Sequence, residues 1–232
     1  MRKLKTVEMQ RLSVEEFKDA PKLPLIVVLD DVRSLYNVGS VFRTCDAFRV
    51  EAVYLCGITG TPPNAEIHKT ALGGEDSVDW RYFENTEDAV QELHDRGYFV
   101  YSIEQVEHST KLQQLCNSKF IIQNSKLGWR GDNSKFIIHN SKLGESGDNS
   151  KFKIQNSKLA DAVDTATENG HSESCFPCAV IFGNEVKGVK QSVVDMSDGC
   201  LEIPQFGTKH SLNVSVTAGI VIWEFAKMKL AK

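Results

Sequence analysis

The sequence contains no apolar run long enough to span a lipid bilayer, and no apolar stretch follows the basic residues at its start. We therefore expect neither a membrane segment nor a secretory signal, and we expect a cytoplasmic protein. A large charge of one sign is also lacking, since the net charge is −4 over 232 residues. This balance argues against binding of polyanions through the overall field and leaves only local basic patches for nucleic acid. The composition, 41% apolar and 25% charged, is that of an ordinary globular protein.

Several ligand-binding motifs are missing as well. There is no GxGxxG motif, which argues against a dinucleotide-binding enzyme, and Val189 stands where a P-loop would need lysine. The CxxC spacing of "CFPC" (175–178) has no second pair of ligands, so we predict no metal site there. Cys45 and Cys56 fall inside apolar elements, where cysteine acts as a small hydrophobic residue. We expect these thiols to be reduced.

An unusual segment interrupts the chain at residues 117–161. Three nearly identical copies of a 16-residue unit, beginning "NSKFIIQNSKLGWRGD", follow one another and carry eight Lys or Arg against four Asp or Glu. A small β-solenoid or a basic arm that touches RNA are two alternatives. The richness in Asn, Ser, Lys and Gly instead favours a mobile duplicated loop, because such residues bury little surface. We predict an insert that is mobile.

Outside the insert, strand-like and helix-like segments alternate. Runs such as "LPLIVVLDD" are nearly all apolar, as buried parallel strands are. This alternation predicts an α/β fold with a mostly parallel sheet and helices on both faces. We expect strands at 23–31, 50–57, 78–83, 98–104, 178–183 and 200–204, and helices at 38–48, 64–72, 86–97 and 211–230, with a capping box at 13–16 starting a short helix.

The stretch "NVGSVFRTCDAF" (37–48) places two polar groups beside the end of a predicted buried strand. Asn37 and Arg43 could simply hold the fold, with Arg43 paired to Asp46 one helical turn away. The alternative is a ligand site, because open α/β sheets bind ligands outside the carboxyl ends of their strands.

Two further polar segments follow predicted strands. "GNEVKG" (183–188) comes directly after one strand, and "IPQFGTKHSLN" (203–213) leads from another strand into the last helix. Taken alone, the first is a strand-to-helix turn, and in the second Ser211 or Asn213 caps a helix. Taken together with Asn37 and Arg43, they lie at strand-end loops of one sheet. We therefore expect the three segments to converge on one crevice.

These three segments carry a resemblance to a known family. "NVGSVFRT" (37–44), "FGNEVKG" (182–188) and "IP…SLNVS" (203–215) occur in the order of the three motifs of the SpoU (TrmH-like) RNA 2′-O-ribose methyltransferases of the SPOUT superfamily. The resemblance covers about residues 20–116 and 175–230. Because all three motifs are present in order, it is far more specific than any one of them.

The resemblance implies a fold and partners that the residues alone do not. Members of this family have a deep trefoil knot in the carboxyl-terminal part of the α/β domain, work as homodimers and use S-adenosylmethionine. The knot is against general expectation, since true knots are essentially absent from proteins. The positions that match the cofactor-binding loops are Gly183, Ile203 and Leu212, which expose backbone rather than polar side chains.

The implied reaction transfers a methyl group to a ribose 2′-hydroxyl of tRNA or rRNA. By resemblance Arg43 activates the hydroxyl, Asn37 orients Arg43 or the ribose, and Glu185, Ser211 and Asn213 complete the pocket. Because arginine is effectively always protonated, we favour Arg43 as a cation that holds the 2′-oxygen and the adjacent phosphate. A neutral Arg43 acting as a true base is the alternative.

Domain boundaries follow from these segments. We expect an amino-terminal helical extension at 1–20 and a SPOUT methyltransferase domain at 21–232 interrupted by the insert at 117–161. For the basic side chains of the extension, contact with RNA and a solvated helix packed on the body are the two alternatives. The alternative function is a SPOUT-fold dimer that binds RNA without modifying it. Neither a metal nor a membrane is expected as a partner.

Overall fold

The computed structural model describes residues 1–9, 11–115, 177–208 and 211–230. The chain divides into two compact units, Met1–Trp129 with Cys175–Lys232, and Arg130–Ser174. Every element described below belongs to the first unit. The predicted insert at 117–161 lies outside the described residues.

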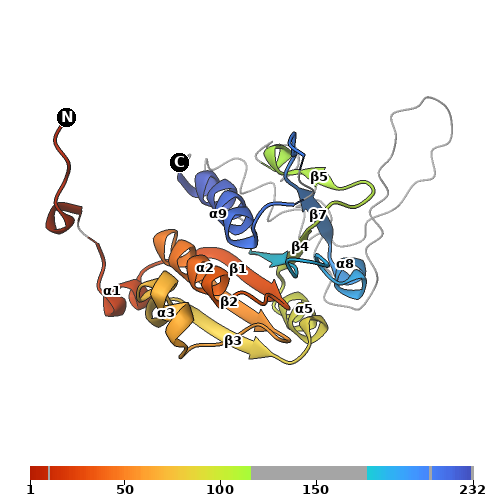
Figure 1. Cartoon of the computed structure of the whole chain (residues 1–232), viewed down its shortest axis with the longest axis horizontal. Coiled ribbons are helices and arrows are strands. Elements are labelled where there is room, and N and C mark those ends of the chain that lie inside the picture. Colours follow the sequence, from red (N-terminus) through yellow and green to blue (C-terminus); the bar gives the residue numbers. More distant parts are fainter. Residues whose placement is uncertain (10, 116–176, 209–210, 231–232) are drawn as a thin grey trace, which may run out of the picture. The chain divides into compact units, whose positions relative to one another are not determined.

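The core of this unit is a seven-stranded sheet in the order β3-β2-β1-β6-β4-β7-β5 (Figure 1). Every pairing between neighbouring strands is parallel. The strands are β1 (Leu23–Asp30), β2 (Val50–Cys56), β3 (Asp79–Phe83), β4 (Phe99–Ile103), β5 (Thr110–Lys111), β6 (Cys178–Phe182) and β7 (Gly199–Glu202). Strand β6, from the distant carboxyl-terminal part of the chain, therefore lies between β1 and β4.

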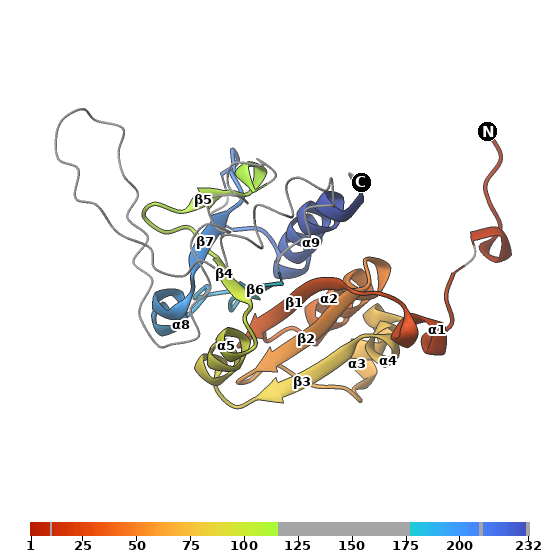
Figure 2. The same cartoon turned by 180° about the vertical axis from the view of Figure 1, so that it is seen from behind.

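Helices cover both faces of the sheet, as the alternation of segments predicted (Figures 1 and 2). Strand β1 alternates between two cores: Leu25 and Val27 pack with the buried residues of α2 and α9, whereas Ile26 and Val28 pack with those of α5 and α8. The described helices are α1 (Val14–Asp19), α2 (Leu35–Ala47), α3 (Ala65–Ala71), α4 (Gly74–Ser77), α5 (Thr86–Asp95), α8 (Gln191–Met196) and α9 (Val214–Leu230), with 3₁₀ turns at Thr6–Met9 and Leu112–Gln114.

The helix starts differ from prediction where a side-chain cap decides them. Helix α2 begins at Leu35 rather than at residue 38, because the Ser34 hydroxyl accepts a hydrogen bond from the Asn37 amide at 3.3 Å. Helix α9 begins at Val214 rather than at residue 211. The capping box of Ser13 and Glu16 is confirmed. The short helices α4 and α8 were missed, since four and six residues give little periodicity.

None of the described helices combines the length and the apolar character that crossing a bilayer requires.

Candidate functional site

The loops at the carboxyl edge of the sheet enclose a cavity of about 340 Å³. Because β4, β6 and β7 run parallel, the segments that follow them leave the sheet on the same side. The cavity is lined by residues 103–105 from the end of β4 onward, 182–188 from the end of β6 onward, 201–203 at the end of β7, and Ser211 and Leu212 before α9. The second and third sequence motifs therefore meet in one pocket, as predicted.

The loop after β6 is a tight turn that closes on itself. The backbone amide of Asn184 donates to the carbonyl of Gly188 at 3.0 Å, and the amide of Gly188 donates back at 2.9 Å. A Cβ atom at Gly183 would lie 2.1 Å from backbone atoms of Gly188 and Val189. Glycine at 183 is therefore required by the close approach of the two ends of the loop.

Glu185, in the same loop, holds the start of the first motif. Its carboxylate accepts hydrogen bonds from the backbone amides of Arg33 at 3.1 Å and Ser34 at 3.2 Å, and from the side-chain amide of Asn37 at 3.3 Å. Burial alone would raise the pKa of Glu185, but these bonds and one from its own backbone outweigh that effect and lower the pKa. Glu185 is thus an ionised group that joins the second motif to the first.

Asn37 joins the first motif to the third. Its side-chain oxygen accepts a hydrogen bond from the Asn213 side-chain amide at 3.1 Å, while its own amide donates to Glu185. Asn213 also caps α9, because its oxygen accepts from the backbone amide of Ser215 at 2.9 Å. Capping and site assembly are therefore combined in one residue. The three motifs meet through the chain of contacts Glu185–Asn37–Asn213.

Arg43 does not join this group within one chain. It lies on the exposed side of α2, six residues beyond Asn37, and is absent from the described lining of the cavity. The simple pairing with Asp46 is also not found among the described residues, since Asp46 accepts a hydrogen bond from the Ser77 hydroxyl at 2.5 Å instead. The expectation that Arg43 and Asn37 converge with the other two motifs therefore holds for Asn37 only.

The residues predicted to hold a cofactor, Gly183, Ile203 and Leu212, all line the cavity, and so do Glu185 and Ser211. Asn37 and Asn213 do not line it and reach it through Glu185. The structure thus separates the pocket residues from a neighbouring pair of polar side chains.

Three residues of this edge were missed by sequence reasoning. Asn184 donates to the backbone carbonyl of Asp31 at 2.8 Å, which fastens the loop after β6 to the end of β1. Asp31 also forms an ion pair with Lys190 at 2.9 Å. Glu104, directly after β4, lines the cavity. Their sequence positions could have identified two of them, because Asp31 and Glu104 are acids immediately after buried strands, where ligand sites of parallel sheets form.

The cysteines that the structure describes give no sign of a reactive or metal-binding site. Burial raises the pKa of Cys45 well above its ordinary range and that of Cys56 to about 12, so both thiols stay protonated. Cys178 is the buried first residue of β6, and Cys175 lies outside the described residues. Within the part of the chain that the structure describes, no three His, Cys, Asp or Glu side chains gather in a way that could hold a metal ion.

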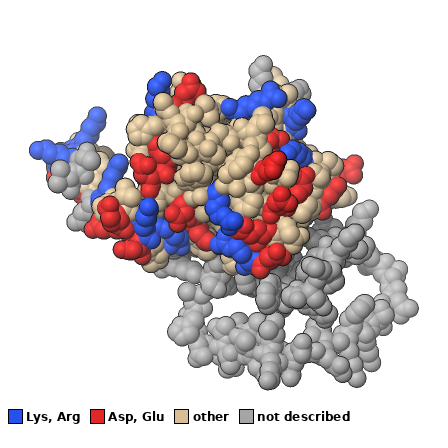
Figure 3. Space-filling model, turned by 90° about the horizontal axis from the view of Figure 1, so that it is seen from below, with Lys and Arg blue, Asp and Glu red and all other residues tan. Residues whose placement is uncertain are grey.

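Charges of both signs are interspersed on the face of the molecule that Figure 3 presents. Ion pairs among the described residues include Arg96 with Glu51 at 2.8 Å. This mixture agrees with the low net charge of the sequence, and it leaves small groups of basic side chains rather than one extended field.

Among the known proteins similar to this chain are methyltransferases of tRNA and of 23S rRNA. A "tRNA (guanosine(18)-2'-O)-methyltransferase" of Thermus thermophilus is 23% identical over 223 residues, which is 96% of this chain and 84% of the relative. A "23S rRNA (guanosine-2'-O-)-methyltransferase" of Neisseria meningitidis is 24% identical over 209 residues, 90% of this chain and 60% of the relative.

Solved structures share the fold. The TrmH/SpoU tRNA modifying enzyme of A. aeolicus superposes with a TM-score of 0.62 at 18% identity, covering 94% of this chain and 83% of that one. The AdoMet-bound rRNA methyltransferase of Sinorhizobium meliloti gives a TM-score of 0.60 at 19% identity, covering 91% and 59%. The model of the SpoU rRNA Methylase family matches residues 24–126 and 141–223. With most of its length matched and its motifs meeting at one edge of the sheet, the chain belongs to the SpoU rRNA Methylase family.

Proposed function

We propose that this protein is an S-adenosylmethionine-dependent RNA methyltransferase that methylates a ribose 2′-hydroxyl of tRNA or rRNA. The observation that carries the proposal is the meeting of the three motifs at one pocket edge, through Glu185, Asn37 and Asn213. The family supports it, as do relatives named for 2′-O-methylation of tRNA and of 23S rRNA.

The pocket fits the cofactor chemically. Gly183, Ile203 and Leu212 line it without polar side chains, so their backbone groups are available to hold a ligand. Glu185 and Glu202 also line the cavity, and their carboxylates suit a ligand with positive charge. When bound there, S-adenosylmethionine supplies an activated methyl group on a sulfonium centre.

The remaining residues would place and activate the ribose. Asn37, held between Glu185 and Asn213, presents side-chain groups in a fixed orientation next to the pocket. Arg43, as a permanent cation, would hold the 2′-oxygen and the adjacent phosphate and stabilise the negative charge that develops on the oxygen. The proton of the hydroxyl would pass to a phosphate oxygen or to water.

We also propose a homodimer in which Arg43 serves the pocket of the other copy. Helices α2 and α9 run side by side in the same direction, because Asn37 contacts Asn213 near their starts and the rings of Phe48 and Trp223 lie 5.7 Å apart further along. Large apolar side chains stay exposed on this pair: Tyr36 (46%), Val216 (52%) and Trp223 (44%). Burying them against a second copy would bring the exposed side of α2, with Arg43, into the interface.

Three further features stay proposals that follow from the family resemblance and the sequence. These are the carboxyl-terminal trefoil knot, the division into an extension at 1–20 and a domain at 21–232 with an insert at 117–161, and a cytoplasmic location. The position of β6 between β1 and β4 is compatible with a chain that passes through a loop of itself.

The decisive experiment is tritium transfer from labelled S-adenosylmethionine to bulk RNA by wild type and by Arg43→Ala. We expect Arg43→Ala to abolish transfer and to leave the melting temperature and cofactor affinity nearly unchanged, because the Arg43 side chain is exposed and outside the pocket. Arg49→Ala removes the same charge from a neighbouring exposed position and should stay active. Full activity of Arg43→Ala would refute its role, and a wild type that binds RNA without transfer would favour the binding-only alternative.

Subunit mixing tests the dimer. Arg43→Ala and Glu185→Ala chains carrying different tags are co-expressed, and mixed dimers are isolated by two affinity steps. If Arg43 serves the other copy, one pocket of each mixed dimer keeps both groups and activity returns to about half of wild type or less. Mixed dimers as inactive as the parents would place Arg43 at its own pocket, and a monomer by light scattering would refute the dimer.

A further inference from the structure

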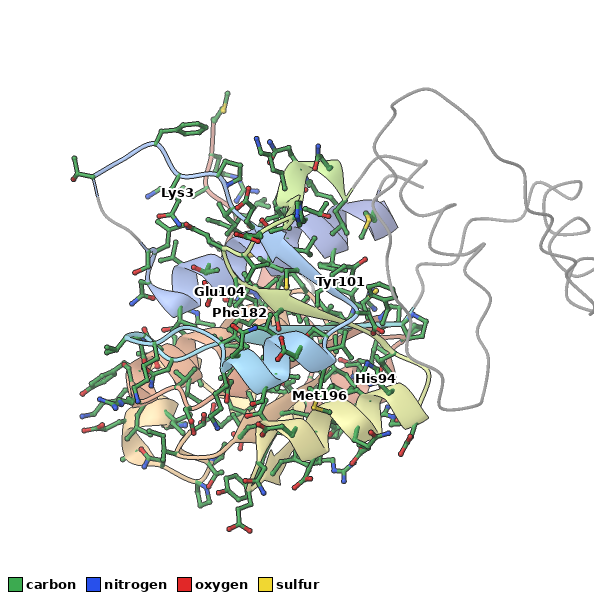
Figure 4. All side chains as sticks on the ribbon, turned by 90° about the vertical axis from the view of Figure 1, so that its right-hand side faces the viewer. Lys3, His94, Tyr101, Glu104, Phe182 and Met196 are labelled. Carbon is green, nitrogen blue, oxygen red and sulfur yellow. The ribbon has the colours of Figure 1, made fainter. Side chains whose placement is uncertain are left out.

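Glu104 connects the end of β4 to the wall of the pocket. It is the first residue after β4, and its backbone amide donates to the carbonyl of Leu201 at the end of β7, at 3.1 Å. Its side chain, labelled in Figure 4 near Phe182, lines the cavity. In the sheet, β4 lies on the other side of β6 from β1, whose following connection Glu185 contacts. The backbone of Glu104 is therefore fixed by the sheet, and the residue lies at the wall of the pocket.

Both oxygens of this carboxylate accept hydrogen bonds from backbone amides. Oε2 accepts a hydrogen bond from the backbone amide of Val189 at 3.0 Å, and Oε1 accepts one from the amide of Gln105 at 2.9 Å. Val189 follows the pocket loop at 184–188 and lies 85 positions away in the chain. A group that accepts from two amides with two oxygens matches a carboxylate, whereas an amide side chain offers only one oxygen.

The backbone of Gly188 packs closely against the same carboxylate. Its φ is +70°, a conformation that residues with a side chain rarely adopt, and a Cβ atom there would lie 2.1 Å from Oε2 of Glu104. Two independent features of the loop, the direction of the Val189 amide and the lack of a side chain at 188, thus fit the position of Glu104.

Val189 is also buried in the core, but the other side-chain hydrogen bonds from this loop to distant described residues lie on its β1 side. Asn184 and Glu185 bind it to the β1–α2 connection. Val186, between these anchors and Gly188, is 78% exposed. Without Glu104 the end of the loop that closes the pocket would keep its bond to Asn184 but lose its bond to β4.

We propose that Glu104 is a positioning residue for the methyl-donor pocket: its carboxylate holds the loop at 183–189 in the shape that binds the cofactor. This inference rests on the proposed function, because the pocket it concerns is the one assigned to S-adenosylmethionine. Glu104 acts through the loop rather than by contact with the reacting atoms, so it sets cofactor affinity and leaves the chemical step alone.

The test measures the Kd of two ligands by calorimetry on the full chain: S-adenosylmethionine, which is cationic at sulfur, and S-adenosylhomocysteine, which is neutral there. We expect Glu104→Ala to weaken both about tenfold and Glu104→Gln to weaken both about threefold, since glutamine keeps one of the two acceptors. Gly188→Ala, which displaces the same carboxylate, should resemble Glu104→Ala. Hydrogen exchange of the Val189 amide should speed up in each variant.

Controls and outcomes separate this inference from the proposed function. Glu107→Gln removes the same charge at an exposed position three residues away and should bind both ligands like wild type. The maximal rate at saturating cofactor should be unchanged in Glu104→Gln, whereas the KM for the cofactor rises. A loss confined to S-adenosylmethionine would overturn the inference, because the carboxylate would then act by its charge and not through the loop.

If wild type binds both ligands and Glu104→Ala binds them equally well, the inference is overturned while the proposed function stands. A wild type that binds neither ligand would overturn the proposed function and the inference together.

Discussion

Replacing Asn37 with aspartate tests the chain of contacts that assembles the site. The change is nearly isosteric and keeps the oxygen that accepts from Asn213 at 3.1 Å. It replaces the amide that donates to Glu185 at 3.3 Å with a carboxylate oxygen. Two negative groups would then face each other where a hydrogen bond had been.

The expected destabilisation follows from the distance between Asn37 and Glu185 and from how exposed the two side chains are. Two unit charges about 3.3 Å apart repel by about 1.3 kcal/mol in water and by about 5 kcal/mol at an effective dielectric constant of 20. Because Glu185 is exposed and Asn37 half-buried, the value near the water limit applies. Losing the hydrogen bond adds about 1 kcal/mol. A negative charge in the first turn of α2 interacts favourably with the helix dipole, which offsets about 0.5 kcal/mol of this loss. We expect a net destabilisation of about 2 kcal/mol.

The assay is urea unfolding of Asn37→Asp and wild type at about pH 7 and about pH 5. The difference should shrink at the lower pH, since repulsion raises the pKa of the new carboxyl and its protonated form can again donate to Glu185. Methyl transfer should fall together with stability, because the same contacts orient Asn37. Asn64→Asp is the matched control, since Asn64 caps α3 through its oxygen and an aspartate there can do the same.

The reasoning would be refuted if Asn37→Asp unfolded with the same free energy as Asn64→Asp at neutral pH. A destabilisation that did not change with pH would show that the effect does not come from the carboxylate of Glu185.

Three further predictions concern separate features. The hydrogen bond from His94 to Asp198 raises the pKa of His94 above 6.5 despite its burial, so this pair stabilises the fold fully below that pH and the contribution is lost as pH rises through the raised pKa. The free energy of unfolding should therefore fall in wild type as the pH rises above 6.5 through the raised pKa of His94, and it should change less in His94→Gln; equal slopes would contradict this. Gly183→Ala must displace the pocket loop and should weaken S-adenosylmethionine binding at least about tenfold by calorimetry. Gly207→Ala, where no described residue beyond the chain neighbours lies within 4 Å of the added Cβ, should bind normally, and equal affinities of the two variants would count against the packing argument. Methyl transfer should survive EDTA unchanged, and a loss that added metal restores would contradict a metal-free reaction.

Local patterns were sufficient for most of the fold. The apolar runs at 23–31 and 178–183 predicted the buried strands β1 and β6, because fully buried parallel strands need apolar residues on both faces. The serine and glutamate at 13 and 16 predicted a helix start that the structure contains. Short elements such as α8 escaped prediction, since six residues with one buried side chain leave no periodic signal.

The sequence by itself determined the α/β class, the strand-end position of the motifs and, through their order, the family. Only the tertiary structure decided which motif residues meet: it joined Asn37 to Glu185 and Asn213, and left Arg43 outside the pocket of its own chain. It also brought Glu104 to the loop at 183–189 across 85 positions of sequence. The physical reason is that periodicity and capping are local, whereas the neighbour of a strand end depends on the sheet order, which inserts β6 between β1 and β4.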